Sequence, residues 1–367
     1  MERNQVYQYP ALEINLNKVY DNIKTMVEIG REKDIEIAGV IKGFNGLTRV
    51  VNKFVEGGCK HLATSRLDQI IQLKDEGIQH PFMLIRIPML SEVKKLVQYA
   101  DISLNSELSV IERIHEECKR QNKRHKVILM ADLGDLREGF WDKGELVEAA
   151  CYIEKKLDGI ELYGVGTNLG CYGSIKPTEE KMNELCSIAE EIEEKINRKL
   201  DIISGGATSS IPLILENKMP KGINHLRIGE GIILAKDLPD LWGLDMDYMH
   251  QDIFTLKAEI IEMKRKPTYP VGEIAIDSFG NKPTYTDRGI RKRALLAMGK
   301  LDYALNDKII PRQKGIEIVG SSSDHLIIDI EDYEGTLKIG DILEFDIYYP
   351  AMIYLTNSRY INITYVE

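Results

Sequence analysis

Short apolar runs alternate with longer amphipathic stretches over residues 1–235. The apolar runs predict eight strands, at 35–42, 61–64, 82–86, 101–104, 126–132, 159–166, 200–204 and 223–228. Between them, apolar residues recur at helical spacing, as in 17–33, 66–77, 106–122, 142–156 and 178–197. Eight strand–helix units in succession predict an α/β fold of the (β/α)8 class, a TIM barrel.

After about residue 240 the pattern changes. The segments "FTLKAEIIEMKRKPTYPVG", "RALLAMG", "GIEIVGSSSDHLIIDIEDYEG" and "GDILEFDIYYPAMIYLTNS" read as strands separated by Gly, Pro and Asp turns, without long helices. We therefore predict two domains, the barrel over residues 1–238 and a mostly-β domain over residues 239–367.

Composition narrows the classes of partner. The formal net charge of −10 over 367 residues disfavours nucleic acid and anionic membrane surfaces as partners. No run of about 18 apolar residues predicts a membrane span, and the first ten residues lack an apolar signal segment. Five scattered cysteines without C-x-x-C spacing indicate reduced thiols in a cytoplasm and no zinc site.

The stretch "GVIKGFNG", residues 39–46, ends an apolar strand on a lysine. One interpretation is that Lys42 reaches solvent from the strand end with its apolar stem buried. The other is that Lys42 is a desolvated amine that forms a Schiff base. Since function in a barrel lies at the carboxyl ends of the strands, the position of Lys42 fits the second interpretation.

The stretch "SGGATSS", residues 204–210, follows the seventh strand and leads into a helix. Small residues let backbone amides approach an anion, and hydroxyls of Ser204, Thr208 or Ser209 could add donors. The alternative is a glycine-rich turn with a Ser or Thr helix cap. A phosphate site facing a strand-end lysine, with Arg227 between them, suggests pyridoxal 5′-phosphate.

Nearly the whole chain resembles the alanine racemase-like, fold-type III pyridoxal phosphate enzymes, and most closely the amino-acid racemase branch that includes ornithine racemase. The similar segments, in order, are "PALEINLNKVYDNI", "GVIKGFNG", "ADLGDLREGF", "SGGATSS", "LRIGEGI" and "IVGSSSDHLIIDI". The resemblance implies a cofactor-dependent racemase that interconverts L- and D-ornithine by two-base proton transfer at Cα, working as a homodimer.

The resemblance also implies roles for individual residues. Lys42 holds the cofactor and is one of the two catalytic bases. Arg227 contacts the pyridine nitrogen, and Arg137 lies near the phenolic oxygen or the substrate carboxylate, unless it only pairs with Asp135 or Glu138. Phosphate binding is assigned to Ser204, Gly205, Gly206, Gly229, Ile232 and, from the C-terminal domain, Tyr349 or else Tyr354.

Ser323 and Asp324 are implied to enter the neighbouring subunit's site and to contact substrate. The chain also departs from the alanine racemase pattern. Gly46 stands in place of a tyrosine, and Thr167 and Asn168 occupy the place of a histidine in the loop after the sixth strand. Asn168 is expected beside the cofactor, and the smaller side chains should admit a longer substrate than alanine.

The second catalytic base is also displaced, because the expected tyrosine position falls on Phe279 or Asn281. We choose Tyr285 for this role, followed by Asp277, with Glu273 also nearby. A cationic substrate side chain would need a buried acceptor, for which Asp277, Asp287 and Asp324 are candidates.

Other functions stay open at this stage. The sequence also fits a broad-specificity, alanine, lysine or serine racemase. His325 leaves room for a metal-dependent D-amino-acid aldolase or dehydratase, although no cysteine accompanies it. The non-enzyme alternative is a pyridoxal phosphate-binding protein, which would normally lack the second domain.

Overall fold

The computed structural model describes residues 8–367 and contains two compact units. The barrel unit covers residues 18–251. The sheet unit combines the described residues up to Asn17 with residues 252–367. Both predicted architectures are confirmed: a closed parallel barrel and a mostly antiparallel β unit.

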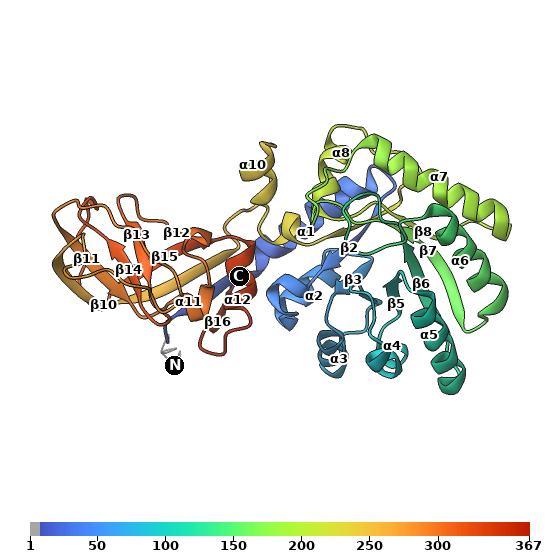
Figure 1. Cartoon of the computed structure of the whole chain (residues 1–367), viewed down its shortest axis with the longest axis horizontal. Helices are drawn as coiled ribbons and strands as arrows, with labels where there is room; N and C mark the ends of the chain where they lie inside the picture. Colours follow the sequence, from blue (N-terminus) through green and yellow to red (C-terminus); the bar gives the residue numbers. More distant parts are fainter. Residues whose placement is uncertain (1–7) are drawn as a thin grey trace. The chain divides into compact units, whose positions relative to one another are not determined.

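The barrel unit closes through eight parallel strands, β2 to β9, with helices around the outside (Figure 1). The strands are β2 (Glu36–Val40), β3 (His61–Thr64), β4 (Phe82–Leu84), β5 (Ile102–Asn105), β6 (His125–Met130), β7 (Ile160–Gly166), β8 (Ile202–Ser204) and β9 (His225–Ile228). Every strand predicted from the sequence corresponds to one of them. The ring closes where Ala38 of β2 pairs with His61 on one side and with Arg227 on the other.

Helices connect the strands in the predicted order. They are α1 (Leu16–Arg31), α2 (Thr48–Glu56), α3 (Leu67–Asp75), α4 (Val93–Tyr99), α5 (Leu108–Gln121), α6 (Lys143–Lys156), α7 (Glu179–Ile196), α8 (Ile211–Leu215), α9 (Glu230–Ile233) and α10 (Asp237–Trp242). Short 3-10 turns are η1 (Lys42–Phe44), η2 (Leu90–Glu92) and η3 (Thr208–Ser210).

Alternate strand residues face the barrel interior, which is filled by apolar side chains. The interior cluster consists of Ala38, Val40, Ala63, Met83, Ile102, Leu104, Ile128, Met130 and Ile202. On the outer face of β2, a Cβ at Gly39 would lie 2.2 Å from the Phe54 ring of α2. A glycine is therefore needed for α2 to pack against β2, the strand that leads into Lys42.

In the sheet unit, the long strand β10 (Phe254–Pro267) joins two sets of partners, in the order β12-β15-β10-β11-β14-β13. The others are β11 (Ile290–Leu296), β12 (Ile309–Pro311), β13 (Glu317–Ser321), β14 (Leu326–Asp329), β15 (Ile342–Ile347) and β16 (Asn362–Val366). Two short helices, α11 (Lys300–Tyr303) and α12 (Tyr349–Leu355), and the turn η4 (Asn306–Lys308) complete the unit.

Two features of this unit differ from the sequence expectation. β1 (Ala11–Asn15) pairs with β10 and β16, so the described N-terminal residues join the sheet unit instead of the barrel. The segment 349–355, which we expected to be extended, forms helix α12. Its proline stands at the second helical position, where the backbone amide has no acceptor within the helix, so the missing amide hydrogen does not disturb the helix.

The boundary between the units lies at 251/252, whereas the sequence suggested 238/239. The physical reason is a polar clamp on α1. The Asn22 side chain donates to the carbonyl oxygens of Ile232 and His250 at 2.9 and 2.8 Å, and it accepts from the His250 amide. This clamp, together with buried Met246 and Met249, holds residues 239–251 on the barrel unit.

All five cysteines are unpaired. Among residues 8–367, no helix combines the length and apolar character that crossing a bilayer requires.

Candidate active site

Lys42 lies at the carboxyl end of β2, as the first residue of the 3-10 turn η1. Its side chain is half-buried and forms no hydrogen bond or ion pair with any residue in the described part of the chain. Burial lowers the pKa of the Lys42 amine from its ordinary value. An amine with a lowered pKa has a larger neutral fraction near neutral pH than a solvated lysine, and the neutral form is the one that can attack as a nucleophile or accept a proton.

Four side chains act electrostatically on the Lys42 amine: Cys171 and Glu138 favour its charged form, and Arg137 and Arg227 oppose it. These residues follow β6 and β7 or lie on β9, so several strand ends converge on one site. The structure thus brings together Lys42, Arg137 and Arg227, which the sequence had singled out. It adds Glu138 and Cys171, for which the sequence analysis had given no site role.

Arg227 is 3% exposed and makes two hydrogen bonds. Its Nη1 donates to the Ser204 hydroxyl at 2.5 Å, and its Nη2 donates to the Thr167 carbonyl at 2.8 Å. Burial lowers its pKa to about 10. Within residues 8–367 no carboxylate pairs with Arg227, and its Nε makes no hydrogen bond. A buried cation that lacks a carboxylate partner is costly unless something else completes its shell.

The loop after β6 holds Arg137 in place. The Asp132 carboxylate accepts from the amides of Gly134 and Leu136 at 2.8 and 3.1 Å. A Cβ at Gly139 would lie 2.5 Å from the Asp132 nitrogen, and φ is +134° there, so only glycine fits. At the tip of this loop the Arg137 guanidinium donates two hydrogen bonds to the Glu138 carboxylate, which raises the pKa of Arg137.

The buried Asp135 carboxylate ties this loop to the loop after β7. It accepts from the amides of Gly170 and Tyr172 at 2.9 and 3.0 Å. Burial alone would raise the pKa of Asp135, but these amide donors outweigh it and hold the pKa below the ordinary value. Asp135 therefore fixes the position of Cys171, which lies between its two amide donors, relative to Arg137.

The expected phosphate loops lie at the ends of β8 and β9, and the structure distinguishes among their hydroxyl groups. Ser204 is fully buried and bonded to Arg227 and to His225, and Ser209 donates to the Leu169 carbonyl at 2.8 Å. The Thr208 hydroxyl instead accepts from the Gly231 amide of α9 at 3.1 Å. Thr208 is thus the hydroxyl at the meeting point of η3 and α9.

Some backbone amides of the same loops already donate hydrogen bonds within the protein, and others do not. The Gly205 amide donates to the His225 carbonyl, and the Ile232 amide donates to the Gly229 carbonyl, both at 3.0 Å. Gly206 has φ of +109°, and a Cβ there would lie 2.8 Å from the Ser210 hydroxyl. Gly205 and Ile232 therefore already use the amides that the sequence assigned to phosphate. The first amides of η3 and α9 have no acceptor within their own turns.

The side-chain amide nitrogen of Asn168, Nδ2, is buried without a hydrogen-bond partner in the described residues. Asn168 belongs to the same loop after β7 as Thr167, whose carbonyl holds Arg227. An unsatisfied buried amide of this kind indicates a missing acceptor.

The remaining predicted residues lie in the sheet unit. Tyr285 is 40% exposed and packs edge-on against Tyr269, with ring centroids 6.3 Å apart. The Asp277 carboxylate accepts from the amides of Phe279 and Asn281, which lowers its pKa. Asp277 is thus a turn residue and a weak base.

Ser323 donates to Asp324 within an exposed turn, and Tyr349 begins α12.

Asp287 behaves like Asp277, because its carboxylate accepts from the Gly289 amide of its own turn at 2.9 Å. His325 is exposed, and its amide donates to the Ser322 hydroxyl. Within residues 8–367, no group of three or more His, Cys, Asp or Glu side chains is arranged to hold a metal ion.

Comparison with known proteins now identifies the family. The family described as alanine racemase, N-terminal domain, matches residues 14–237. The chain belongs to this family. Ornithine racemase of Acetoanaerobium sticklandii is 41% identical over 96% of this chain and 98% of its own length. Lysine racemase of Thermotoga maritima is 37% identical over 97% of this chain and 98% of its own length.

Solved structures share the fold. Alanine racemase from Streptomyces lavendulae superposes with a TM-score of 0.78 at 15% identity, covering 98% of each chain. Alanine racemase from Bartonella henselae, with covalently bound pyridoxal phosphate, superposes with a TM-score of 0.71 at 16% identity. That match covers 97% of this chain and 99% of the other.

The sequence analysis missed Glu138, Cys171 and Asp135 as parts of the site. Asp135 and Glu138 flank the arginine in "GDLREGF", and they had entered only as possible surface partners of Arg137. A charged residue directly beside a predicted site arginine, on a glycine-bounded strand-end loop, was the available signal. For Cys171, nothing in the sequence pointed to the site except its loop.

Proposed function

We propose that this chain is a pyridoxal phosphate-dependent racemase of amino acids that carry a second amino group, with ornithine as the preferred substrate. The observation that carries the proposal is the Lys42 amine, which is half-buried, unpaired and lowered in pKa where the strand-end loops converge. The relatives named ornithine racemase and lysine racemase support the substrate class.

The residues at the barrel end suit this cofactor. Lys42 would be the covalent anchor, buried Arg227 would hold the pyridine nitrogen through Nε, and the Asn168 side-chain nitrogen, which lacks a partner in the described residues, would donate to the cofactor. The Thr208 hydroxyl and the backbone amides of Thr208 and Glu230, which begin η3 and α9, would hold the phosphate. When bound, the cofactor supplies the electron sink that acidifies the Cα proton of an amino acid.

Proton transfer then depends on two bases. Lys42 takes or returns the Cα proton on one face, and its lowered pKa keeps a larger neutral fraction near neutral pH. We assign the opposite face to Tyr285, because the alternative, Asp277, is engaged by the amides of its own turn. Tyr285 and Asp324 reach the site from a second copy of the chain in a homodimer.

We assign the substrate carboxylate to Arg137, since a guanidinium matches that group bidentately, and substrate binding would then release or share the two hydrogen bonds that Arg137 donates to Glu138. The second amino group needs an acceptor, and the Glu138 carboxylate acts electrostatically on Lys42. Among the earlier candidates, Asp277 and Asp287 accept bonds within their own turns. Glu138 is itself paired with Arg137, but it acts electrostatically on Lys42, so we assign recognition of the distal ammonium to Glu138.

The test compares kcat/KM for L-ornithine, L-lysine, L-alanine and L-serine, with chiral analysis of the products. The proposal predicts D-product from all active substrates and a clear preference for ornithine and lysine. Better turnover of alanine or serine would contradict the substrate class, and the absence of any D-product would contradict racemisation.

A substitution sharpens the assignment of Glu138. Glu138→Gln should lower kcat/KM for ornithine by about 10- to 100-fold, as expected for loss of one charge-assisted hydrogen bond, relative to its effect on alanine. Equal losses for both substrates would show that Glu138 only orients Arg137.

A further inference from the structure

Behind Arg227, a line of buried polar side chains runs into the barrel. The Arg227 Nη1 atom donates to the Ser204 hydroxyl at 2.5 Å, and the same hydroxyl lies 2.9 Å from His225 Nδ1. Ser204 and His225 are both fully buried. Neither histidine nor serine has a role in the proposed proton transfers, so this line needs its own explanation.

Counting hydrogens fixes the form of His225. A guanidinium only donates, so the Ser204 oxygen accepts from Arg227. The one other partner of that hydroxyl in the described residues is His225 Nδ1. If Nδ1 carried a hydrogen, the hydroxyl hydrogen of Ser204 would be buried without an acceptor, which is costly. The hydroxyl therefore donates to Nδ1, and His225 carries its hydrogen on Nε2.

The His225 ring packs against a second buried histidine, His61. His225 Nε2 has no partner in the described part of the chain, and neither has His61 Nδ1. The two rings lie edge to face with centroids 5.5 Å apart, and His61 is 3% exposed. Two buried ring nitrogens without a partner, on rings packed edge to face, are a usual setting of an ordered internal water when one nitrogen donates and the other accepts.

We propose that one buried water bridges His225 Nε2 and His61 Nδ1, and that Ser204, His225 and His61 are positioning residues that fix the guanidinium of Arg227. The importance of this for the cofactor rests on the proposed function. The guanidinium has two acceptors, Ser204 and the Thr167 carbonyl, and loss of the first would let it turn about the second.

The line also keeps positive charge away from Arg227. Burial holds the pKa of His225 well below its ordinary value, with further lowering by His61 and Arg227. Burial, together with Lys60, His80 and Lys126 and against the opposing effect of Asp101, lowers the pKa of His61 to about 4. Both imidazoles are therefore neutral at physiological pH.

The barrel contains a matched control. His125 of β6 lies 2.9 Å from the Ser103 hydroxyl of β5, and both side chains are fully buried. Burial lowers the pKa of His125 to about 4. This pair resembles His225 and Ser204 in chemistry and burial, but it has no bond to Arg227.

The first measurement uses the full chain without cofactor, with ¹⁵N-labelled histidine, and reads the tautomer and charge of each imidazole by NMR. His225→Gln identifies the signal. The proposal predicts a neutral His225 with its hydrogen on Nε2 from pH 6 to 9. A hydrogen on Nδ1, or a charged ring, would overturn it. This result does not depend on whether the chain is a racemase.

A crystal structure that resolves waters gives the second result. One water within hydrogen-bond distance of both His225 Nε2 and His61 Nδ1 is expected, and a dry gap would overturn the bridging water.

The third measurement compares Ser204→Ala with Ser103→Ala by titrating each cofactor-free protein with pyridoxal phosphate. Ser204→Ala should weaken binding by about tenfold, the scale of one hydrogen bond, while Ser103→Ala leaves it unchanged. Equal effects of the two changes would overturn the positioning role. Should Ser204→Ala not fold, His225→Gln against His125→Gln provides the same comparison. Failure of the wild type to bind the cofactor would refute the proposed function and leave the NMR and water results standing.

Discussion

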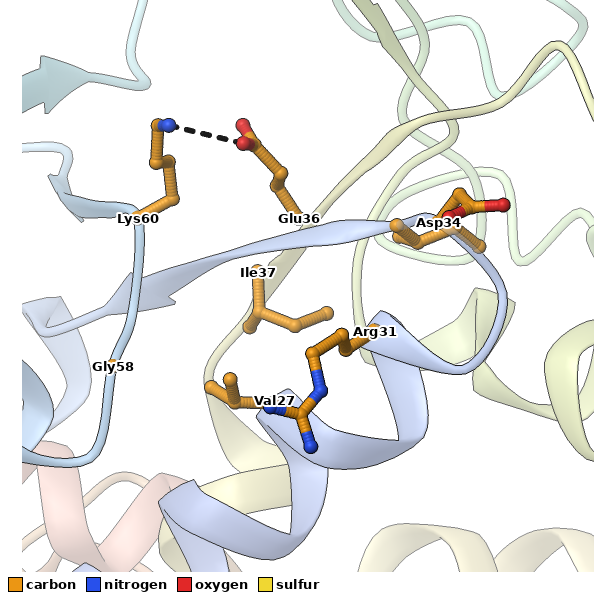
Figure 2. A pocket seen from close by; sticks show the side chains of 8 residues that line it. Val27, Arg31, Asp34, Glu36, Ile37, Gly58 and Lys60 are labelled. Atoms are coloured by element: carbon orange, nitrogen blue, oxygen red, sulfur yellow. Dashed lines mark ion pairs between the residues drawn. The ribbon is translucent and has the colours of Figure 1, made fainter.

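Lysine side chains at the two ends of the barrel have pKa values shifted in opposite directions. At the amino-terminal end, Lys60 pairs with Glu36 at 3.0 Å across a pocket beside α1, where the two side chains face each other (Figure 2). Hydrogen bonding to Glu36 raises the pKa of Lys60. At the carboxyl-terminal end, Lys42 has no partner in the described residues, and burial lowers its pKa.

The difference teaches that concavity alone does not mark the site. The amino-terminal pocket contains the ion pair of Lys60 with Glu36, and Lys74 pairs with Asp101 nearby at 3.4 Å. The carboxyl-terminal end collects ionisable groups that are buried without a matching charge. Such mismatch is costly to folding and is characteristic of functional sites.

Substituting the two lysines should give the largest contrast. Lys42→Ala is expected to lower racemisation on the order of 10³-fold or more, because it removes both the proposed cofactor anchor and one of the two proposed bases. Lys60→Ala should leave kcat/KM within about twofold, since an exposed ion pair contributes little. Chiral assays of both variants check this, and comparable losses would erase the distinction between the two ends.

The proposed second base, Tyr285, is assigned to a second copy of the chain, so its substitution tests whether the active site is shared between two copies. Tyr285→Phe should lower racemisation by about 10²- to 10⁴-fold through loss of one proton-transfer group. Mixing and refolding it with Lys42→Ala should restore about a quarter of wild-type activity, because half of the dimers then contain one complete composite site. No recovery in verified mixed dimers would refute shared sites.

Glu230 is a carboxylate that is likewise buried without a matching charge. It is buried at the start of α9, one oxygen has no partner in the described chain, and burial raises its pKa to about 7. The unfolded chain loses this proton near its ordinary pKa of 4.5, before the folded chain does. Stability should therefore fall as pH rises from about 4.5 to 7, by up to about 3 kcal/mol.

Glu230→Gln should remove that decline, because glutamine stays neutral. Urea unfolding at pH 5 and pH 8 measures it for both proteins, with Glu36→Gln as the amino-terminal control. If wild type and Glu230→Gln lose the same free energy between the two pH values, the buried carboxyl is not the cause.

The smallest effect belongs to the exposed pair. Glu36→Gln should reduce the free energy of unfolding by less than about 1 kcal/mol, as for most surface ion pairs, and the reduction should shrink in high salt. A larger, salt-independent loss would mean that the amino-terminal end also depends on specific charges.

Sequence patterning was sufficient for the barrel because every strand is an apolar run followed by a helical repeat. It also located Lys42, Arg137 and Arg227, which stand at strand ends where topology brings them together. It could not reveal β1, whose pairing with β10 and β16 joins residues far apart in the chain. Nor could it show that the Ser204 hydroxyl, which the resemblance assigns to phosphate, is bonded to Arg227 and His225, because such contacts depend on which way a strand residue faces.

The most direct test of the account is to reduce the cofactor-loaded protein with borohydride and map the modified peptide. We predict pyridoxyl modification of Lys42 alone, with Lys60 and the other ion-paired lysines unmodified. Modification of a different lysine, or a loaded protein in which no lysine is fixed by reduction, would contradict the claim that the active site lies at the carboxyl-terminal end of the barrel.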